Sequence, residues 1–373
     1  MTRGSREVVL VTGYPRLQAR RLVQHILDHE PETTIVVVVL EKLLADARHR
    51  FMELDADQRA RMQVLVGDAA AIDLGLSGAE YKALAAEVTR IHHLAHVSYV
   101  GVDRATAEYT NIQGAVEVVE LGRAAERLTR IVHHSTAHVS GDRAGTVYEH
   151  ELDEGQGFHS VVQETRMKAE LVMRRAMMEL PISVVRPTML VGDSVTGQAD
   201  RFDGPYLLVM LVLGLPGEMA VPLPDPGDKL LDIVPVDYVV RAAHAIGRHP
   251  DAASRTFHLA SQEEVRAQRV FDLIAEAGGR RTRRTFIPTQ VASAVLRTPG
   301  IERLVHEPRA FMQQLTCSAR YDTRNTRRFI GDGCVDCPPL ESYISTWVAA
   351  VQQHLRRRRG ASLAAGPDDD PLL

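Results

Sequence analysis

The sequence predicts an α/β protein built on a doubly wound parallel sheet. Short runs of β-branched residues, such as Glu7–Thr12 and Thr34–Leu40, have the continuous hydrophobicity of strands that are buried on both faces. Segments with the apolar spacing of helices alternate with these runs, and this alternation is the pattern of βαβ units with right-handed crossovers. Sheets of this kind bind ligands beyond the carboxyl ends of their strands. The residues that follow each predicted strand are therefore the candidates for a site.

The alternation continues in order along the first 260 residues. Further strands are predicted at Gln63–Val66, Arg90–Ala95, Arg130–His134, Ile182–Arg186 and Thr256–Leu259. Helices are predicted at Leu17–Leu27, Val116–Leu128 and Glu164–Leu180, and Leu231–Ala245 has the pattern of a strand that runs into a helix. We therefore expect a sheet core at residues 1–200 and a smaller C-terminal lobe at 201–355, which returns the elements at 231–260 to the core. Residues 356–373, a run of arginines followed by small and acidic residues, are expected to form a disordered tail.

The composition is that of an ordinary globular protein, with 373 residues, 45% hydrophobic and 25% charged. The formal net charge of −4 gives no indication of a nucleic-acid partner. The N-terminus lacks the apolar segment of a signal peptide, and the longest apolar run, Tyr206–Leu215, is too short to cross a bilayer. Cys334 and Cys337 are interpreted as two ordinary thiols in a loop. The sequence thus predicts a cytoplasmic protein without a membrane span.

Several motifs occur in a fixed order between residues 7 and 260, among them VLVTGYPRLQARRLV, IHHLAHVSY, TNIQGAVEVVEL, HHSTAHVSGDRAG and VVRPTMLVGDSVTGQ. Together they resemble the extended short-chain dehydrogenase/reductase family, and most closely its thioester-reductase and fatty-acyl-CoA-reductase branch. The resemblance implies a Rossmann fold that binds a nicotinamide dinucleotide, with a substrate lobe beside it. It also assigns roles to individual positions, and these can be checked one by one.

The resemblance places a phosphate-binding turn at residues 12–19, where the family pattern is T-G-x-x-G-x-x-G. Gly13 matches the first glycine and is followed by Tyr14, and Ala19 is an accepted replacement for the third glycine. Arg16 replaces the second glycine, and a side chain there should crowd the dinucleotide. Arg16 either points outward and pairs with a phosphate, or fills the phosphate site itself. We favour impaired binding, which makes NAD(P) a doubtful cofactor.

The positions that the family uses for the adenosine half of the cofactor are also altered. Leu40 stands where relatives carry the residue that selects NADP or NAD, and leucine can serve neither. Glu41 follows it and could reach a ribose hydroxyl, although a glutamate that opens a helix is explained equally well by the helix dipole. The resemblance assigns Asp68 to the adenine and Ala95 to a backbone contact with the cofactor. Both residues also suit a plain turn at the end of a strand.

The resemblance further implies a catalytic set, of which two parts remain. Asn111 matches the asparagine of the family's water relay, and Thr136 matches the hydroxyl group that holds the substrate carbonyl. Val162 occupies the place of the catalytic tyrosine, and Arg166 occupies the place of the lysine. Valine cannot donate a proton, and arginine stays protonated. No tyrosine occurs at residues 149–205, so the loss does not depend on the alignment.

A histidine is the natural surrogate acid near neutral pH. His96 and His138 follow predicted strands, and His159 precedes the predicted catalytic helix. A surrogate acid, either His138 or His159, or a site in which all three histidines bind a metal, is conceivable. The chain contains 16 histidines, so such a grouping arises easily by chance, and we predict no metal.

Phosphate binding, cofactor selection and proton donation are all altered, which predicts a non-catalytic pseudo-reductase that binds an acyl-type small molecule or a partner protein. The alternative is an NAD(P)H-dependent oxidoreductase that acts on an acyl thioester or an aldehyde with a non-standard proton donor. The run Tyr206–Leu215 would line the substrate side, or it would form a core helix or a dimer contact. The apolar residues of Glu164–Leu180, including Met167 and Leu171, are compatible with a homodimer.

Overall fold

The computed structural model describes residues 7–99, 101–214, 221–224, 229–280, 284–287, 319–331 and 335–364. The chain forms two compact units. The first unit consists of Met1–Thr188, Val236–Ala260 and Cys317–Cys337, and the second unit consists of Met189–Pro235, Ser261–Thr316 and Pro338–Leu373. The two units are therefore interleaved along the sequence, because the chain leaves the first unit and returns to it twice.

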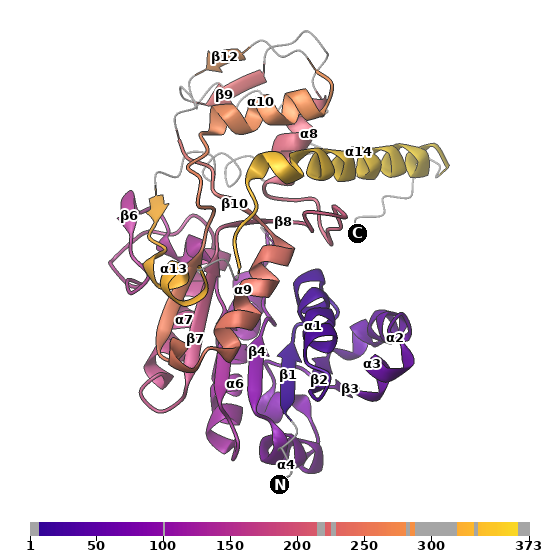
Figure 1. Cartoon of the computed structure of the whole chain (residues 1–373), viewed down its shortest axis with the longest axis vertical. Helices are drawn as coiled ribbons and strands as arrows, with labels where there is room; N and C mark the ends of the chain where they lie inside the picture. Colours follow the sequence, from indigo (N-terminus) through magenta and orange to yellow (C-terminus); the bar gives the residue numbers. More distant parts are fainter. Residues whose placement is uncertain are drawn as a thin grey trace. The chain divides into compact units, whose positions relative to one another are not determined.

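A seven-stranded parallel sheet forms the centre of the first unit (Figure 1). Its strands lie in the order β11-β7-β5-β4-β1-β2-β3. Their bounds are β1 Val8–Thr12, β2 Thr34–Val39, β3 Met62–Val66, β4 Arg90–His93, β5 Arg130–His134, β7 Ile182–Pro187 and β11 Arg255–Leu259. The strand order reverses beside β1, which is the doubly wound arrangement, so the predicted fold class is confirmed. The carboxyl ends of β1, β4 and β5 are neighbours at this reversal.

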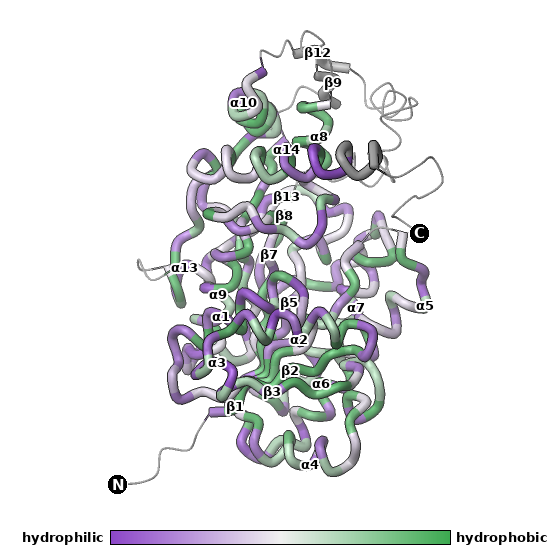
Figure 2. The backbone as a smooth tube through the Cα atoms, turned by 90° about the vertical axis from the view of Figure 1, so that its right-hand side faces the viewer, coloured by the Kyte–Doolittle hydropathy of each residue, from purple (hydrophilic) through white to green (hydrophobic). Residues whose placement is uncertain are grey.

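Helices cover both faces of the sheet. On one face, Ile91 of β4 packs with Val118 and Met173 in the core that α4, α6 and α7 share with the strands. The next residue, His92, points to the opposite face, where it lies against Gly247 of α9. Figure 2 shows the hydrophobic strand segments between helices of mixed polarity. The helices of this unit are α1 Leu17–His29, α2 Leu44–Met52, α3 Ala56–Ala60, α4 Gly78–Glu87, α5 Arg104–Ala107, α6 Gly114–Ala124, α7 Val161–Ala176 and α9 Val236–Arg248.

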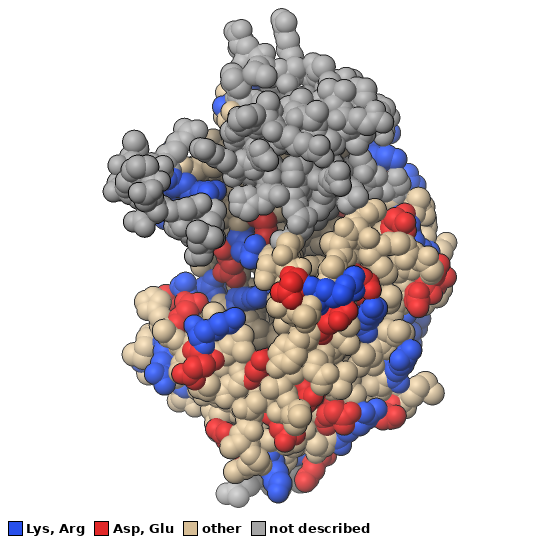
Figure 3. Space-filling model, turned by 180° about the vertical axis from the view of Figure 1, so that it is seen from behind, with Lys and Arg blue, Asp and Glu red and all other residues tan. Residues whose placement is uncertain are grey.

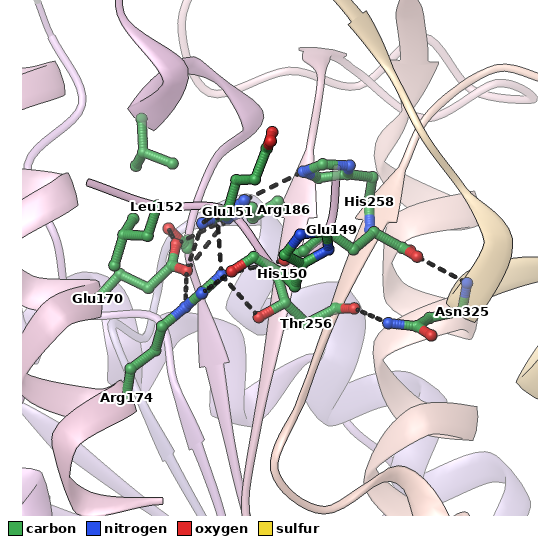
Figure 4. A network of polar contacts seen from close by, with 12 residues as sticks. Glu149, His150, Glu151, Leu152, Glu170, Arg174, Arg186, Thr256, His258 and Asn325 are labelled. Atoms are coloured by element: carbon green, nitrogen blue, oxygen red, sulfur yellow. Dashed lines mark hydrogen bonds and ion pairs between the residues drawn. The ribbon is translucent and has the colours of Figure 1, made fainter. Parts of the chain in front are cut away.

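A buried network of charged side chains joins α7 to the edge of the sheet (Figure 4). The carboxylate of Glu170 is fully buried and accepts hydrogen bonds from Arg186 Nη2 at 2.7 Å, Arg174 Nε at 2.9 Å and Ser135 Oγ at 2.6 Å. Arg186 Nη1 also contacts His258 Nε2 of β11 at 3.1 Å. One carboxylate on α7 thus holds arginines from two elements against strands β5, β7 and β11.

The segment from residue 319 to 331 is tied to the same edge. Strand β13 (Ala319–Tyr321) pairs in parallel with β6 (Gly145–Val147), and helix α13 (Arg324–Ile330) follows it. The buried carboxylate of Glu149 accepts the backbone N–H of Asn325 at 2.6 Å, at the start of α13. A distant part of the chain therefore completes the first unit.

The second unit is built around the longest apolar run of the sequence. This run forms α8 (Tyr206–Gly214), whose Leu208, Val209 and Val212 are buried in one core with Ile274 and Trp347. It is a core helix of this unit. The other elements are β8 Met189–Val191, β9 Val221–Pro224, β10 Ile233–Pro235, α10 Ala267–Ala277, β12 Arg284–Ile287 and α14 Leu340–Ala364.

Helix α14 continues through residue 364, into the segment for which the sequence predicts a disordered tail. Residues 365–373 and Cys334 lie outside the described residues. Among the residues that the structure describes, no helix combines the length and the hydrophobicity that a bilayer span requires. Acidic and basic side chains are interspersed over the described part of the face seen in Figure 3, and neither charge dominates a large patch there.

Candidate functional site

The turn after β1 requires glycine at position 13 for two reasons. Gly13 has a φ of +84°, in the left-handed region, and a Cβ atom there would lie 2.6 Å from the carbonyl oxygen of Leu94. Thr12 fixes the same approach, since its Oγ1 accepts the backbone N–H groups of Leu94 and Ala95, each at 3.0 Å. The turn is therefore held directly against the loop that follows β4, and Ala95 lies at this contact.

Arg16 spans these two segments with its side chain. Its Nη1 donates to the backbone oxygen of His96 at 2.5 Å, and its backbone N–H donates to Gly13 O at 3.2 Å. The side chain is exposed, and the residue is the N-cap of α1. The guanidinium group thus lies at the carboxyl ends of β1 and β4, in the place that the family resemblance assigns to the phosphates.

The other predicted cofactor residues are dispersed around this turn. Tyr14 is 4% exposed, and burial raises the pKa of its hydroxyl to about 12, so the ring is part of the packing. Ala19 is buried in α1, as the close packing of this helix requires. Glu41 is exposed after β2, at the start of a short 3-10 helix. Asp68 follows β3, and its Oδ2 accepts the hydroxyl of Tyr109 at 3.2 Å.

The two matching catalytic positions, Asn111 and Thr136, are engaged by groups of the protein. Asn111 lies in one turn of π-helix and is buried; its Oδ1 accepts the backbone N–H of Val97 at 2.9 Å, and its Nδ2 donates to Thr165 Oγ1 at 2.9 Å. It therefore ties the loop after β4 to α7. Thr136 follows β5 and is half-buried, and its Oγ1 accepts the backbone N–H of His138 at 3.3 Å.

Val162 and Arg166 lie one turn apart on α7. Val162 is half-buried and packs against the apolar cluster that contains Val97 and Ala107. Arg166 is 4% exposed, and its Nη2 donates to the backbone oxygen of His134, at the end of β5, at 2.6 Å. An apolar side chain and an anchored guanidinium group thus occupy the positions of the expected tyrosine and lysine.

The environment of Arg166 is unfavourable for its charge. Burial lowers the pKa of Arg166 to about 9, with Glu170 raising it and Arg16 lowering it further. Nε of Arg166 is buried without a hydrogen-bond partner. The cation still carries its proton at pH 7, so the structure buries a charge that lacks a full set of partners.

The three histidines that the sequence analysis brings together, His96, His138 and His159, do not share one environment. Burial lowers the pKa of His138 to about 4. Burial and the charge of Arg166 hold the pKa of His96 well below 6.5. Both imidazoles are therefore neutral at pH 7 and are poor proton donors. His159 is exposed before α7. The described part of the chain holds no group of three His, Cys, Asp or Glu residues that could bind a metal.

Sequence reasoning missed four buried histidines at the ends of the two central strands. His93 and His133 stack with ring centroids 5.5 Å apart on one face of the sheet. On the other face, His134 Nε2 contacts His92 Nδ1 at 3.3 Å, and His134 Nδ1 contacts Gln18 Nε2 at 3.0 Å. The available signal was the pair of strand sequences, RIHH and RIVHH, each of which ends in two histidines.

Comparison with known proteins assigns the chain to a family. The model of the male sterility protein family matches residues 11–243, which is more than half of the chain. The nonribosomal peptide synthetase asaC of Aspergillus flavus is 26% identical over 298 residues, and the fatty acyl-CoA reductase wat of Drosophila melanogaster is 24% identical over 222 residues. These alignments cover 72% and 52% of this chain, but only 28% and 42% of the two relatives. A linear gramicidin synthase polypeptide of Brevibacillus parabrevis is 27% identical over 214 residues, 55% of this chain and 4% of its own length.

Solved structures show the same fold over almost the whole chain. The terminal R domain of the myxalamid PKS-NRPS biosynthetic pathway has a TM-score of 0.80 at 20% identity, with 94% of this chain and 92% of that chain covered. The reductase domain of a nonribosomal peptide synthetase from Mycobacterium tuberculosis has a TM-score of 0.72 at 20% identity, covering 94% and 91%. The fold predicted from the resemblance is therefore confirmed. The curated relatives thus include a nonribosomal peptide synthetase and a fatty acyl-CoA reductase. The match of the family model over residues 11–243 shows that this chain belongs to the male sterility protein family.

Proposed function

We propose that this chain is a non-reducing member of its family, which binds a ligand or a partner at the carboxyl edge of its sheet without transferring hydride. The observation that carries the proposal is the pair Val162 and Arg166. Val162 offers no proton and packs in an apolar cluster, and Arg166 is fixed to His134 O at 2.6 Å. Of the two histidines that could serve as acid in the alternative, a reductase with a non-standard proton donor, His138 is neutral at pH 7 and His159 is exposed before α7.

The family and some neighbours of its fold imply a nicotinamide dinucleotide, such as the NAD bound to the UDP-glucuronic acid 4-epimerase of Bacillus cereus, at a TM-score of 0.67 and 16% identity, with 93% of this chain and 99% of that chain covered. The residues of this chain fit such a group poorly. Gly13 retains the close turn, but the guanidinium group of Arg16 spans from this turn to His96 O, where the phosphates are expected. Leu40 has no polar atom for a ribose or a 2′-phosphate. No step of a mechanism is therefore assigned to a dinucleotide.

A gain-of-function series tests the proposal. The wild type is expected to show no oxidation of NADPH or NADH with an aliphatic aldehyde or an acyl thioester. The triple variant Arg16→Gly, Val162→Tyr, Arg166→Lys restores the glycine, tyrosine and lysine that the family pattern has at these positions. Its turnover should exceed that of the wild type by at least about 100-fold, because a positioned general acid contributes on this scale. The measurement is absorbance at the nicotinamide band under saturating substrate.

The control carries the same valine-to-tyrosine and arginine-to-lysine changes at exposed positions, Val195→Tyr with Arg123→Lys, and should remain inactive. Val195 is 82% exposed, and Arg123 lies on the outer surface of α6. The double variant Val162→Tyr, Arg166→Lys keeps Arg16. Comparing its turnover with that of the triple variant therefore separates the loss of the proton donor from the loss of cofactor binding. Reduction of either substrate by the wild type at the rate of the triple variant would rule out a non-reducing protein.

A further inference from the structure

The residues that the structure describes compensate the buried charge of Arg166 only in part. Its side chain is buried, its hydrogen bond is to His134 O, and its Nε has no partner. Within the described ranges, no carboxylate oxygen forms an ion pair with this guanidinium group. Burial of a cation without a counter-ion is expensive, and such a group is stabilised by an anion that binds beside it.

Glu170 is close enough to raise the pKa of Arg166, but it forms no ion pair with this guanidinium group. It lies one turn further along α7, but its two oxygens already accept Arg186, Arg174 and Ser135 at 2.6 to 3.1 Å. The same carboxylate therefore serves a different pair of arginines. The remaining charge on Arg166 is directed toward the end of β5, at the edge where a ligand of this fold binds.

Two further features favour an anion at this edge. Helix α1, with 13 residues, begins at the neighbouring β1 turn, its first turn contains no acidic residue, and its N-terminal N–H groups carry partial positive charge. Arg16 caps this helix and is exposed, and it donates to His96 O after β4, next to the end of β5 where Arg166 donates to His134 O. Its charge lowers the pKa of Arg166. The imidazoles of His93 and His96 nearby are neutral, so they add hydrogen-bonding groups and no competing charge.

We propose that the carboxyl edge of the sheet binds a compact oxyanion, the phosphate or carboxylate group of a ligand, between the guanidinium groups of Arg166 and Arg16. This inference rests on the proposed function and names its ligand class. The group is compact because the bond from Arg16 to His96 O joins the β1 turn to the loop after β4, where an extended dinucleotide would have to pass. Guanidinium groups suit oxyanions through paired N–H donors.

The test is calorimetric titration of the purified full-length protein with inorganic phosphate, and separately with sodium acetate and with NADPH, in a buffer without other oxyanions. Saturable binding of phosphate, acetate or both is expected, and it distinguishes the two sources of the oxyanion. Arg166→Met should abolish this heat and Arg16→Ala should weaken the affinity at least about tenfold, the loss expected for one charge-assisted contact. Absence of saturable binding of both probes by the wild type, or equal affinity in Arg166→Met, would overturn the proposal.

Thermal stability in the same oxyanion-free buffer provides a second measurement. Because the charge of Arg166 is buried without an ion-pair partner, Arg166→Met should melt at or above the temperature of the wild type. Arg186→Met is the matched control, since Arg186 is equally buried but paired with Glu170 at 2.7 Å, and it should melt several degrees lower. If Arg166→Met instead melts as low as this control, Arg166 is a structural residue and the proposal fails.

The outcomes remain separable from those of the proposed function. Hydride transfer by the wild type would refute the proposed non-reducing function, whether or not phosphate binds. An affinity for phosphate and acetate that does not depend on Arg166 would refute the oxyanion site, and it would say nothing about hydride transfer. If Arg166→Met fails to fold, Arg16→Ala, a substitution at an exposed residue, still allows the oxyanion affinity of a variant to be compared with that of the wild type.

Discussion

Lowering the pH from 7.5 to 5 is expected to remove on the order of 8 kcal/mol from the free energy of unfolding through four buried histidines alone, which is enough to unfold a domain of ordinary stability. These are His92, His93, His133 and His134, each of which is at most 3% exposed. Burial also lowers the pKa of His96, His138 and His258, so these residues add to the effect. Burial lowers the pKa of His93 and His134 to about 3, and it holds the pKa of His92 and His133 well below 6.5. Arg166, whose charge faces three of these rings, lowers their pKa further.

The direction follows from where each state binds protons. In the unfolded chain a histidine titrates near 6.5, whereas these four stay neutral in the folded protein far below that value. Below pH 6.5 the unfolded state therefore binds more protons, and stability that is complete above this pH is lost as the pH falls. Each buried histidine removes about 1.4 kcal/mol per pH unit, or about 2 kcal/mol by pH 5. Glu30 and Glu170 are carboxylates whose pKa is lowered in the folded protein from the ordinary value of 4.5. Their contribution to stability is also lost as the pH falls, but only below about pH 4.5.

Urea unfolding between pH 5.5 and 8 measures this slope directly. His133→Leu is the informative variant, because neither ring nitrogen of His133 has a hydrogen-bond partner and leucine leaves no polar group unsatisfied. The slope should become shallower by about one proton. His49→Leu, at a side chain that is 72% exposed, is the control and should leave the slope unchanged. A wild-type slope equivalent to less than about one proton would show that the four histidines are not held neutral.

The strands of the first unit were predictable because central parallel strands are buried on both faces. Val9, Leu10 and Val11 of β1 are completely buried, and such a run is apolar at every position. Helix bounds were less secure. The helix predicted at Val116–Leu128 begins at Gly114 and ends at Ala124, since Ala125 has extended backbone that turns the chain toward β5. Local apolar spacing does not contain this information.

The candidate site was predictable in its positions and not in its contacts. The order of motifs placed Arg166 on α7 and Arg16 at the start of α1. Their partners, His134 O and His96 O, are 32 and 80 residues away in the chain. The docking of residues 319–330 onto Glu149 has a separation of 176 residues. Contacts of this kind follow from the packed fold, so a single sequence shows which groups need partners but not which groups supply them.

Glu170→Ala is expected to lower the free energy of unfolding by about 3–5 kcal/mol, the loss that follows when one partner of a buried ion pair is removed. The substitution leaves Arg186, which is 1% exposed, without its carboxylate, and it removes the acceptor of Ser135 Oγ. Arg174 loses only part of its support, because its guanidinium group also donates to the backbone oxygens of residues 149–151. The measurement is the urea midpoint at pH 7.5, where the histidines add nothing.

A double-mutant cycle separates the pair from the burial of its members. Arg186→Met alone leaves Glu170 with Arg174 and Ser135 as its remaining partners, and Glu170→Leu alone leaves Arg186 without a carboxylate. The double variant Glu170→Leu, Arg186→Met replaces both charges by apolar groups of similar size. The double variant should therefore lose less stability than the sum of the single variants, by about 1–3 kcal/mol. Arg123→Ala, which breaks the exposed pair with Glu179 at 3.0 Å, should leave the midpoint unchanged. Additive losses in the cycle would mean that Glu170 and Arg186 contribute through packing alone, and that the cohesion of α7 with β7 does not depend on their charges.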